Sequence, residues 1–196
     1  MIDFKEICKD DPYLIFKDLY DQSYGLNQAN IEAICISSYS KENKEINSRF
    51  VNLKFVSNEE FFFFTNYNSS KGKEFSSHDQ ISAVIYWNKL NVQIRMKAKI
   101  KKTRRDFNQS YFETRDKNKN ALAISSNQSN EINSYQDVKD NYHRALQEGN
   151  LKKCPKYWGG YSFTPYEIEF WEGNEFRLNK RNLYIKDNNT WTHFML

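Results

Sequence analysis

The chain has 196 residues, with 29 Lys or Arg against 25 Asp or Glu, so its formal net charge is +4 at neutral pH. This length suits one domain with a substantial core, and the diffuse basic excess is weaker than sequence-independent nucleic-acid binding requires. The sequence shows neither the apolar run of about 20 residues of a membrane helix nor the apolar stretch of an export signal. Three widely spaced cysteines without a CxxC pair indicate neither a disulfide framework nor a zinc site. We therefore expect a cytoplasmic protein without a metal site or membrane contact.

The first part of the chain predicts a helix followed by a meander of strands. Asp11 and Pro12 are typical of a helix start, with Asp as the cap and Pro at the first helical position, within an N-terminal helical segment over 1–27. Short apolar or alternating runs separated by polar turns then indicate strands. These strands are expected at residues 33–37, 49–56, 61–65, 80–87 and 92–101.

A helical insertion over 104–150 interrupts the strands. Phe107, Tyr111 and Phe112 recur at about one helical turn and predict a helix over 104–113. Ser134 with Asp137 resembles a capping box and opens a helix that ends near Gly149. Strands are expected again at 157–163, 166–171, 176–186 and 190–195. The whole pattern predicts one mainly β domain over 1–196, a closed or nearly closed small barrel of six or more antiparallel strands with flanking helices.

The segment between Glu169 and Arg181 is the strongest candidate for a binding site. In a strand over 176–186, Arg177, Asn179 and Arg181 would share one face close to Trp171. Paired guanidinium groups beside an aromatic ring suit a flat, anionic, phosphate-bearing ligand. A solvated edge strand explains the same residues, and on this segment alone it is the simpler interpretation.

Other polar positions could complete such a site. The turn at 69–72, with sequence Ser-Ser-Lys-Gly, enters a helix after Thr65 and could cradle a phosphate together with Arg49 or Lys54. Amide side chains such as Gln93 suit the edge of a heteroaromatic ring. Each feature alone is equally typical of a solvated surface. Because the sequence contains none of the common nucleophile or metal motifs, any difficult chemistry is expected to come from a cofactor.

Taken in order, these pieces resemble the pyridoxamine 5′-phosphate oxidase family. The resemblance runs from about Asp11 to Trp191 and rests on collinear motifs: SRFVNLK at 48–54, FTN at 64–66, SSKG at 69–72, Trp87 with NVQ at 91–93, YF at 111–112, QS at 128–129, WGGY at 158–161 and EFWxG…RLNxR at 169–181. It implies an FMN-binding split barrel that works as a homodimer with flavin at the subunit interface. The implied reaction, part of vitamin B6 salvage, oxidises pyridoxine or pyridoxamine 5′-phosphate to pyridoxal 5′-phosphate, with hydride passing to FMN and O2 as the final acceptor.

The resemblance also assigns residues. The implied FMN contacts are Arg49, Phe50, Val51, Asn52, Leu53, Lys54, Phe64, Thr65, Ser70, Lys71, Gln93, Gln128, Ser129, Trp171 and Arg181. The implied contacts to the phosphate of a small aromatic substrate are Lys54, Tyr111, Arg115 and Lys119. Arg177 and Asn179 would hold the substrate ring against the flavin and are the candidate catalytic residues.

The sequence departs from the family pattern mainly on the substrate side. Asn179 stands where the family has histidine, and Lys119 where serine is usual, while on the flavin side Ser70 replaces an arginine. The family's amino-terminal Arg-x-x-Tyr segment has no counterpart before Asp11, and residues 193–196 replace its closing Arg-Leu-x-Pro. One alternative is therefore a related split-barrel flavoenzyme that acts on a different aromatic metabolite. Another is a small β-barrel that binds single-stranded nucleic acid through aromatic and lysine side chains.

Overall fold

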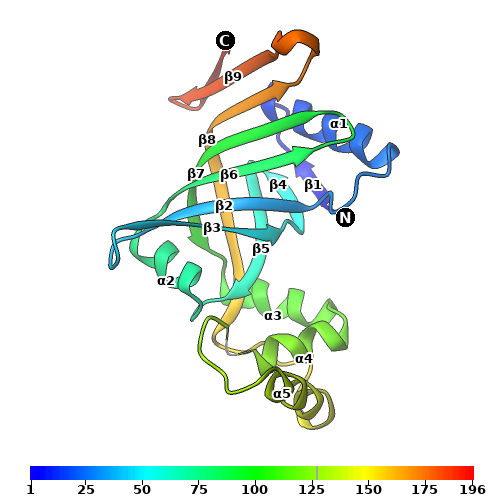
Figure 1. Ribbon diagram of the computed structural model, residues 1–196, viewed down its shortest axis with the longest axis vertical. Coiled ribbons are helices and arrows are strands. Elements are labelled where there is room, and N and C mark those ends of the chain that lie inside the picture. The colour runs from blue at the N-terminus through cyan, green and yellow to red at the C-terminus, as the bar shows by residue number, and fades with distance from the viewer. Residues whose placement is uncertain (127) are drawn as a thin grey trace.

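The computed structural model describes residues 1–126 and 128–196, which form a mainly β structure flanked by helices (Figure 1). The strands are β1 (Asp3–Ile7), β2 (Ala33–Ser40), β3 (Glu45–Asn52), β4 (Phe55–Asn58), β5 (Glu60–Asn66), β6 (Gln80–Trp87), β7 (Val92–Lys102), β8 (Trp158–Glu172), β9 (Lys180–Asp187) and β10 (Thr190–Met195). The helices are α1 (Asp11–Gly25), α2 (Ser70–Ser77), α3 (Arg105–Thr114), α4 (Lys117–Ser125), α5 (Tyr135–Glu148) and the short 3-10 helix η1 (Glu175–Arg177).

The described strands form one ten-stranded sheet. Its main path runs β1-β4-β5-β8-β7-β6-β2-β3, and β9 pairs with β8 on one side and β10 on the other. The sheet is open, because β1 and β3 at the ends of this path do not pair with each other in the part of the chain that the structure describes. A fully closed barrel is therefore wrong. The pairs are antiparallel except β1 with β4, which run parallel.

Alternating burial explains why these segments form strands around a core. In β2 and β6, every second side chain is buried, as expected for a sheet with one covered face. Phe61 lies at the centre of this core, where its ring stacks on Phe163 at 5.2 Å and meets Phe16 of α1 edge-on at 5.0 Å. All three rings are fully buried, and burial of each stabilises the fold by about 1.5–3 kcal/mol. Helix α1 therefore covers the sheet.

Several predicted element boundaries differ from the structure. The N-terminal segment is not purely helical, since Asp3–Ile7 forms β1 beside β4. The predicted strand 49–56 is divided between β3 and β4. The Leu53 amide still bonds Glu32, in register with β2, but the Lys54 amide bonds Phe62 of β5. The two strands predicted at 157–163 and 166–171 are one strand, β8, whose register shifts beside Pro165. A bulge of this kind accommodates proline in a strand.

The helices follow local capping signals in most cases. The capping box predicted at Ser134 is present, because its hydroxyl accepts from the Asp137 amide at 3.1 Å and Asp137 accepts from the Ser134 amide at 3.0 Å. Helix α1 begins at Asp11, so its cap is Asp10. Helix α4 was not predicted. Among the described residues, no helix is both long and apolar enough to span a membrane.

The long axis of the molecule separates two groups of elements. Helices α3, α4 and α5 lie at one end, and the β9–β10 hairpin lies at the other (Figure 1). Strand β8 runs most of the way between them and pairs with β5, β7 and β9. Residues carried by α3 and α4 are therefore far from those carried by β9 within one chain.

Candidate functional site

A cavity of about 690 Å³ lies where the ends of β3 and β5 meet α2, α3 and α4. It is lined by Met1, Glu32, Phe50, Val51, Asn52, Lys54, Phe64, Thr65, Lys71, Tyr111, Thr114, Arg115, Asp116, Lys119 and Gln128. The predicted substrate-phosphate contacts from residues 54 to 119 all belong to this lining, together with many of the predicted flavin contacts. The structure therefore brings together predicted contacts that are up to 78 positions apart, from Phe50 to Gln128.

The cavity concentrates positive charge. Lys54, Lys71 and Arg115 are half-buried, and Lys119 is exposed at the rim. Within the described residues, none of these cations forms a salt bridge with a carboxylate. Burial lowers the pKa of Lys54, and the neighbouring charges of Lys119 and Arg115 lower it further, although Glu32 opposes them. Cations that are partly desolvated and unpaired are stabilised by an anion, so the cavity is electrostatically prepared for one.

Arg115 is held in a defined position at the inner wall. Its guanidinium lies over the ring of Trp158, 4.4 Å from the centroid, and its Nη1 donates to Oδ1 of Asn120 at 3.1 Å. Burial lowers its pKa as well. The Phe64 and Tyr111 rings stack at 3.9 Å beside it. This wall combines an oriented cation with a flat aromatic surface, which suits a ring that carries an anionic group.

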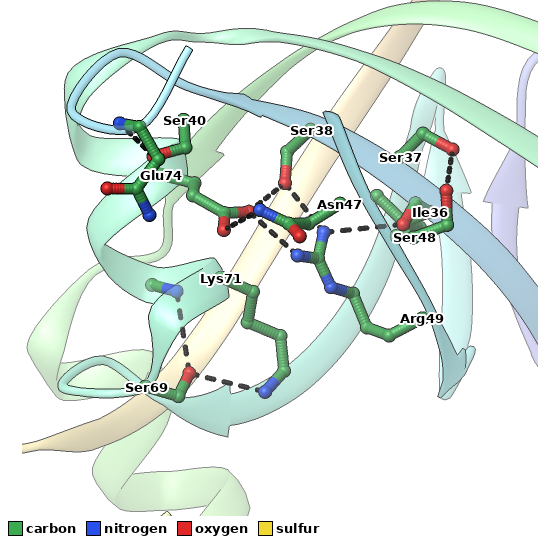
Figure 2. A network of polar contacts seen from close by, with 12 residues as sticks. Ile36, Ser37, Ser38, Ser40, Asn47, Ser48, Arg49, Ser69, Lys71 and Glu74 are labelled. Carbon is green, nitrogen blue, oxygen red and sulfur yellow. Dashed lines mark hydrogen bonds and ion pairs between the residues drawn. The ribbon is translucent and has the colours of Figure 1, made fainter. Parts of the chain in front are cut away.

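The start of α2 supplies the second cationic corner. Ser69 caps the helix, and its hydroxyl accepts from the Gly72 amide at 3.4 Å and from Lys71 Nζ at 3.2 Å (Figure 2). Burial lowers the pKa of Lys71, ahead of the effect of Arg49. Gly72 must stay small, because a Cβ there would collide with the backbone of Tyr67. Ser70 is exposed and does not line the cavity.

Arg49, a predicted FMN contact, forms an ion pair with a buried carboxylate. Its Nη2 lies 2.7 Å from Oε2 of Glu74 on α2, and its Nη1 donates to the Ser38 hydroxyl at 2.6 Å (Figure 2). Glu74 is only 5% exposed and also accepts from Ser38 and from Asn47 Nδ2. Sequence reasoning missed Glu74, since nothing local marks an acid 25 residues away as a partner of Arg49.

A second group of predicted contacts lies outside the cavity. Gln93, Trp171 and Arg181 are neighbours in register across β7, β8 and β9. Glu169, which is 7% exposed, accepts from Arg181 Nε at 2.7 Å and also pairs with Arg95. This buried carboxylate holds the Arg181 guanidinium on β9, at the end of the molecule opposite α3, α4 and α5 (Figure 1).

Arg177 and Asn179 do not lie on a strand, which corrects the prediction for 176–186. The chain forms η1 over Glu175–Arg177, and β9 begins only at Lys180. Phe176 and Arg177 have positive φ values of 55° and 62°, which is incompatible with the alternation of an extended strand. The side chain of Asn179 accepts from the Asn174 amide at 3.2 Å and closes this loop. Arg177 is exposed beside Phe176, which is 90% exposed.

The remaining predicted contacts divide between core and loop. The Leu53 side chain is fully buried in the hydrophobic core, so only its backbone could meet a ligand. Gln128 accepts from the Thr65 hydroxyl at 3.3 Å, which ties the polar loop to β5. Ser129 is exposed in that loop with a φ of 66°. Sequence reasoning also missed the lining residues Met1, Glu32, Thr114 and Asp116, which have no distinguishing local pattern.

Comparison with known proteins decides the family. A pyridoxine/pyridoxamine 5′-phosphate oxidase of Legionella pneumophila (strain Paris) is 32% identical over 191 residues, covering 96% of this chain and 88% of the relative. One from Leptospira interrogans (serovar copenhageni) is 28% identical over 189 residues, covering 95% and 88%. The chain belongs to the pyridoxine/pyridoxamine 5′-phosphate oxidase family. The family model of the pyridoxine 5′-phosphate oxidase C-terminal dimerisation region matches residues 158–196.

Solved structures confirm the fold. PhzG from Burkholderia lata, solved with tetrahydrophenazine-1-carboxylic acid, aligns with a TM-score of 0.89 at 22% identity, covering 95% of this chain and 92% of that one. A pyridoxamine 5′-phosphate oxidase-related FMN-binding protein from Nostoc punctiforme aligns with a TM-score of 0.77 at 10% identity, covering 96% and 98%. The predicted split-barrel fold is thereby confirmed. The family's matched dimerisation region contains Trp171, Arg177, Asn179 and Arg181.

Proposed function

We propose that this protein is an FMN-dependent oxidase that converts pyridoxine or pyridoxamine 5′-phosphate to pyridoxal 5′-phosphate, with O2 as acceptor. The observation that supports this best is the cavity in which Lys54, Lys71, Arg115 and Lys119 converge without carboxylate partners among the described residues. Such a cavity suits a ligand with phosphate groups. A cytoplasmic location is part of the proposal, because three free cysteines fit a reducing compartment.

The residues present fit FMN. Lys71 and the capped start of α2 offer a cation and backbone amides, the combination that binds phosphate. Thr65 and Gln128 add polar groups for the edge of a ring. A volume of about 690 Å³ is within the ordinary range for cofactor cavities. Bound FMN would supply the capacity to accept a hydride, which no side chain of this chain provides.

The second group of predicted contacts can reach the cavity only from another copy. In one chain, α3 and α4 lie at one end of the long axis and β9 at the other (Figure 1). In a two-fold dimer, each subunit presents the same two surfaces to its partner. We therefore propose a homodimer in which Arg177 of the partner subunit and Arg181 of the partner subunit complete each site. The match of residues 158–196 to a dimerisation region supports this arrangement.

Within the completed site, the chain's own residues would bind and orient the substrate. Arg115, fixed over Trp158, and Lys54 would hold the substrate phosphate, with Lys119 adding charge at the rim. Arg177 of the partner subunit would hold the substrate ring in a near-attack position. The remaining candidate catalytic residue, Asn179, can donate or accept a hydrogen bond but does not titrate, so proton transfer cannot depend on it.

The test is to separate turnover from flavin binding. Arg177→Ala should abolish oxidation of pyridoxine 5′-phosphate while FMN stays bound, because Arg177 is exposed and outside the cavity of its own chain. Arg104→Ala is the matched control, since Arg104 is also exposed and is not among the proposed site residues. Full turnover in Arg177→Ala would contradict the role proposed for it. A colourless protein that cannot be reconstituted with FMN would contradict the proposal as a whole.

A second candidate keeps the flavin and changes the substrate. It is favoured by Asn179, which replaces the family's histidine, and by the extra positive charge of Lys119 at the cavity rim. Under this alternative, a different aromatic metabolite is oxidised. Robust peroxide production from pyridoxine 5′-phosphate would eliminate it. Oligonucleotide binding is not proposed, because the exposed lysines that follow one another along β7, Lys97, Lys99 and Lys101, are each paired with a carboxylate.

A further inference from the structure

A cluster of metal-ligating side chains lies outside the flavin cavity, where the chain passes from β1 into α1. The Sγ atom of Cys8 and carboxylate oxygens of Asp10 and Glu59 all lie within 4.8 Å of one another. The backbone places them there, because the Cys8 amide donates to the Asn58 carbonyl at 3.2 Å, beside Glu59, while Asp10 caps α1. All three side chains are half-buried. None of them belongs to the proposed flavin or substrate site.

A second, independent observation indicates a missing ligand at this place. Tyr13 is 0% exposed, and its hydroxyl has no hydrogen-bond partner among the described residues. Burial raises the pKa of Tyr13, and the nearby charges of Glu59, Cys8 and Asp10 raise it further, so the phenol keeps its proton and can donate a hydrogen bond beside the cluster. The Nε1 atom of Trp191, whose ring centroid lies 6.0 Å from that of Tyr13, is likewise buried and unpartnered. Buried donors need an acceptor.

The charge of the cluster favours a divalent cation. Lys186 Nζ lies 2.6 Å from Oε1 of Glu59, which leaves Oε2 of that carboxylate available as a ligand. If Cys8 binds as a thiolate, its charge and those of Asp10 and Glu59 are balanced by the Lys186 ammonium and one divalent ion. Without the ion, the Lys186 ammonium is paired with Glu59, and Asp10 forms no salt bridge among the described residues. A thiolate with two carboxylates is a donor set that suits Zn²⁺.

We propose that Cys8, Asp10 and Glu59 bind one divalent transition-metal ion, Zn²⁺ or an ion of similar softness, with water as the fourth ligand. The water oxygen would accept the hydrogen bond that the Tyr13 hydroxyl now lacks. Ligand atoms around tetrahedral zinc are about 3–4 Å apart, so small side-chain rotations from the present spacing of up to 4.8 Å would close the site. An adjoining hollow of about 450 Å³, lined in part by Asp10 and Trp191, gives solvent access.

The proposed site differs from the expectation of no metal, which relied on sequence spacing. That expectation looked for cysteine pairs and histidine spacing along the chain. Here one ligand follows β1, one caps α1 and one lies in the β4–β5 turn, 51 positions after Cys8. The parallel pairing of β1 with β4 brings them together. The ion would fasten the start of α1 to the sheet, which is a structural role separate from the flavin cavity.

The test uses Co²⁺ as a spectroscopic probe on the full chain without a polyhistidine tag, after chelator treatment. Wild-type protein should bind one Co²⁺ with a thiolate charge-transfer band that Zn²⁺ abolishes, and Zn²⁺ should raise the melting temperature. Cys8→Ser should lose the band, and Glu59→Gln should bind at least about tenfold more weakly. Cys35→Ser is the matched control, because Cys35 is an equally half-buried free cysteine outside the cluster, and it should keep the band.

Several results would overturn the assignment. These are no charge-transfer band in the wild type, a band that survives Cys8→Ser, or a band lost with Cys35→Ser. Thermal unfolding without metal shows whether each variant is folded, and Glu59→Gln provides a second variant that retains the thiol. Binding should also weaken as pH falls, because the Cys8 thiol must lose its proton to bind the ion.

Discussion

Lys71 offers the sharpest test of where a flavin phosphate would bind. Its ammonium is half-buried in the cavity wall, and Ser69 Oγ at 3.2 Å is its hydrogen-bond partner among the described residues (Figure 2). Lys71→Met keeps most of the side-chain volume and removes the charge. Riboflavin is the matched ligand, because it carries the same ring system as FMN without the phosphate.

The expected loss is confined to FMN. A hydrogen bond to a charged group contributes about 1.5–3 kcal/mol, so the dissociation constant for FMN should rise by about 10- to 150-fold. The dissociation constant for riboflavin should stay within about twofold. In the apoprotein, burial lowers the folded-state pKa of Lys71 below its unfolded value. At pH values below its folded-state pKa, the charged Lys71 therefore lowers the free energy of unfolding. This destabilisation is relieved as pH rises through the folded-state pKa and the lysine loses its proton. At neutral pH, Lys71→Met should keep or raise the melting temperature.

Quenching of flavin fluorescence measures both dissociation constants. Lys73→Met is the control, because Lys73 is exposed on the same helix and does not line the cavity. It should bind both flavins as the wild type does. Equal weakening of FMN and riboflavin by Lys71→Met, or no weakening of either, would refute the assignment of the phosphate to the start of α2.

Three further outcomes concern stability. Arg49→Met leaves the buried Glu74 carboxylate unpaired, so this substitution should lower the free energy of unfolding by about 3–5 kcal/mol, measured by denaturant titration. Adding Glu74→Gln should restore most of the lost stability. Additive losses from the two substitutions would contradict the pairing. Burial raises the pKa of Glu169, but its two arginine partners outweigh this and lower it. The Glu169 carboxylate should therefore add to the free energy of unfolding above its unfolded-state pKa, and this contribution should be lost as pH falls through its folded-state pKa. In Glu169→Gln, the free energy of unfolding should fall less steeply with decreasing pH. Gly159→Ala would force a Cβ against the Tyr67 hydroxyl and should cost about 1–3 kcal/mol, measured by thermal unfolding; an unchanged melting temperature would contradict the close packing.

Features with local causes could be predicted from the sequence. The limits of β6 match the prediction at 80–87, because alternating apolar residues define a half-buried strand without reference to the rest of the fold. The capping box at Ser134 is present for the same reason, since its hydrogen bonds join residues three positions apart. The collinear motifs predicted the family and placed Lys54, Lys71 and Arg115 at one cavity.

Features that depend on distant partners could not be predicted. Strand β1 is five residues long and exists through its parallel pairing with β4. The predicted strand face at Arg177 and Asn179 is absent because positive φ values turn the chain there before β9 begins. The pairing of Arg49 with Glu74 likewise joins β3 to α2 across the fold. Sequence periodicity describes one element at a time, so contacts between elements lie beyond it.

The most direct test of the proposed function is an absorbance spectrum of the FMN-reconstituted protein, recorded anaerobically before and after addition of pyridoxine 5′-phosphate. We expect one FMN per chain, loss of the oxidised-flavin absorbance on addition of the substrate, and its return with peroxide formation when O2 is admitted. A protein that takes up no FMN would contradict the cofactor assignment. A bound flavin that stays oxidised in excess substrate would contradict the proposed reaction.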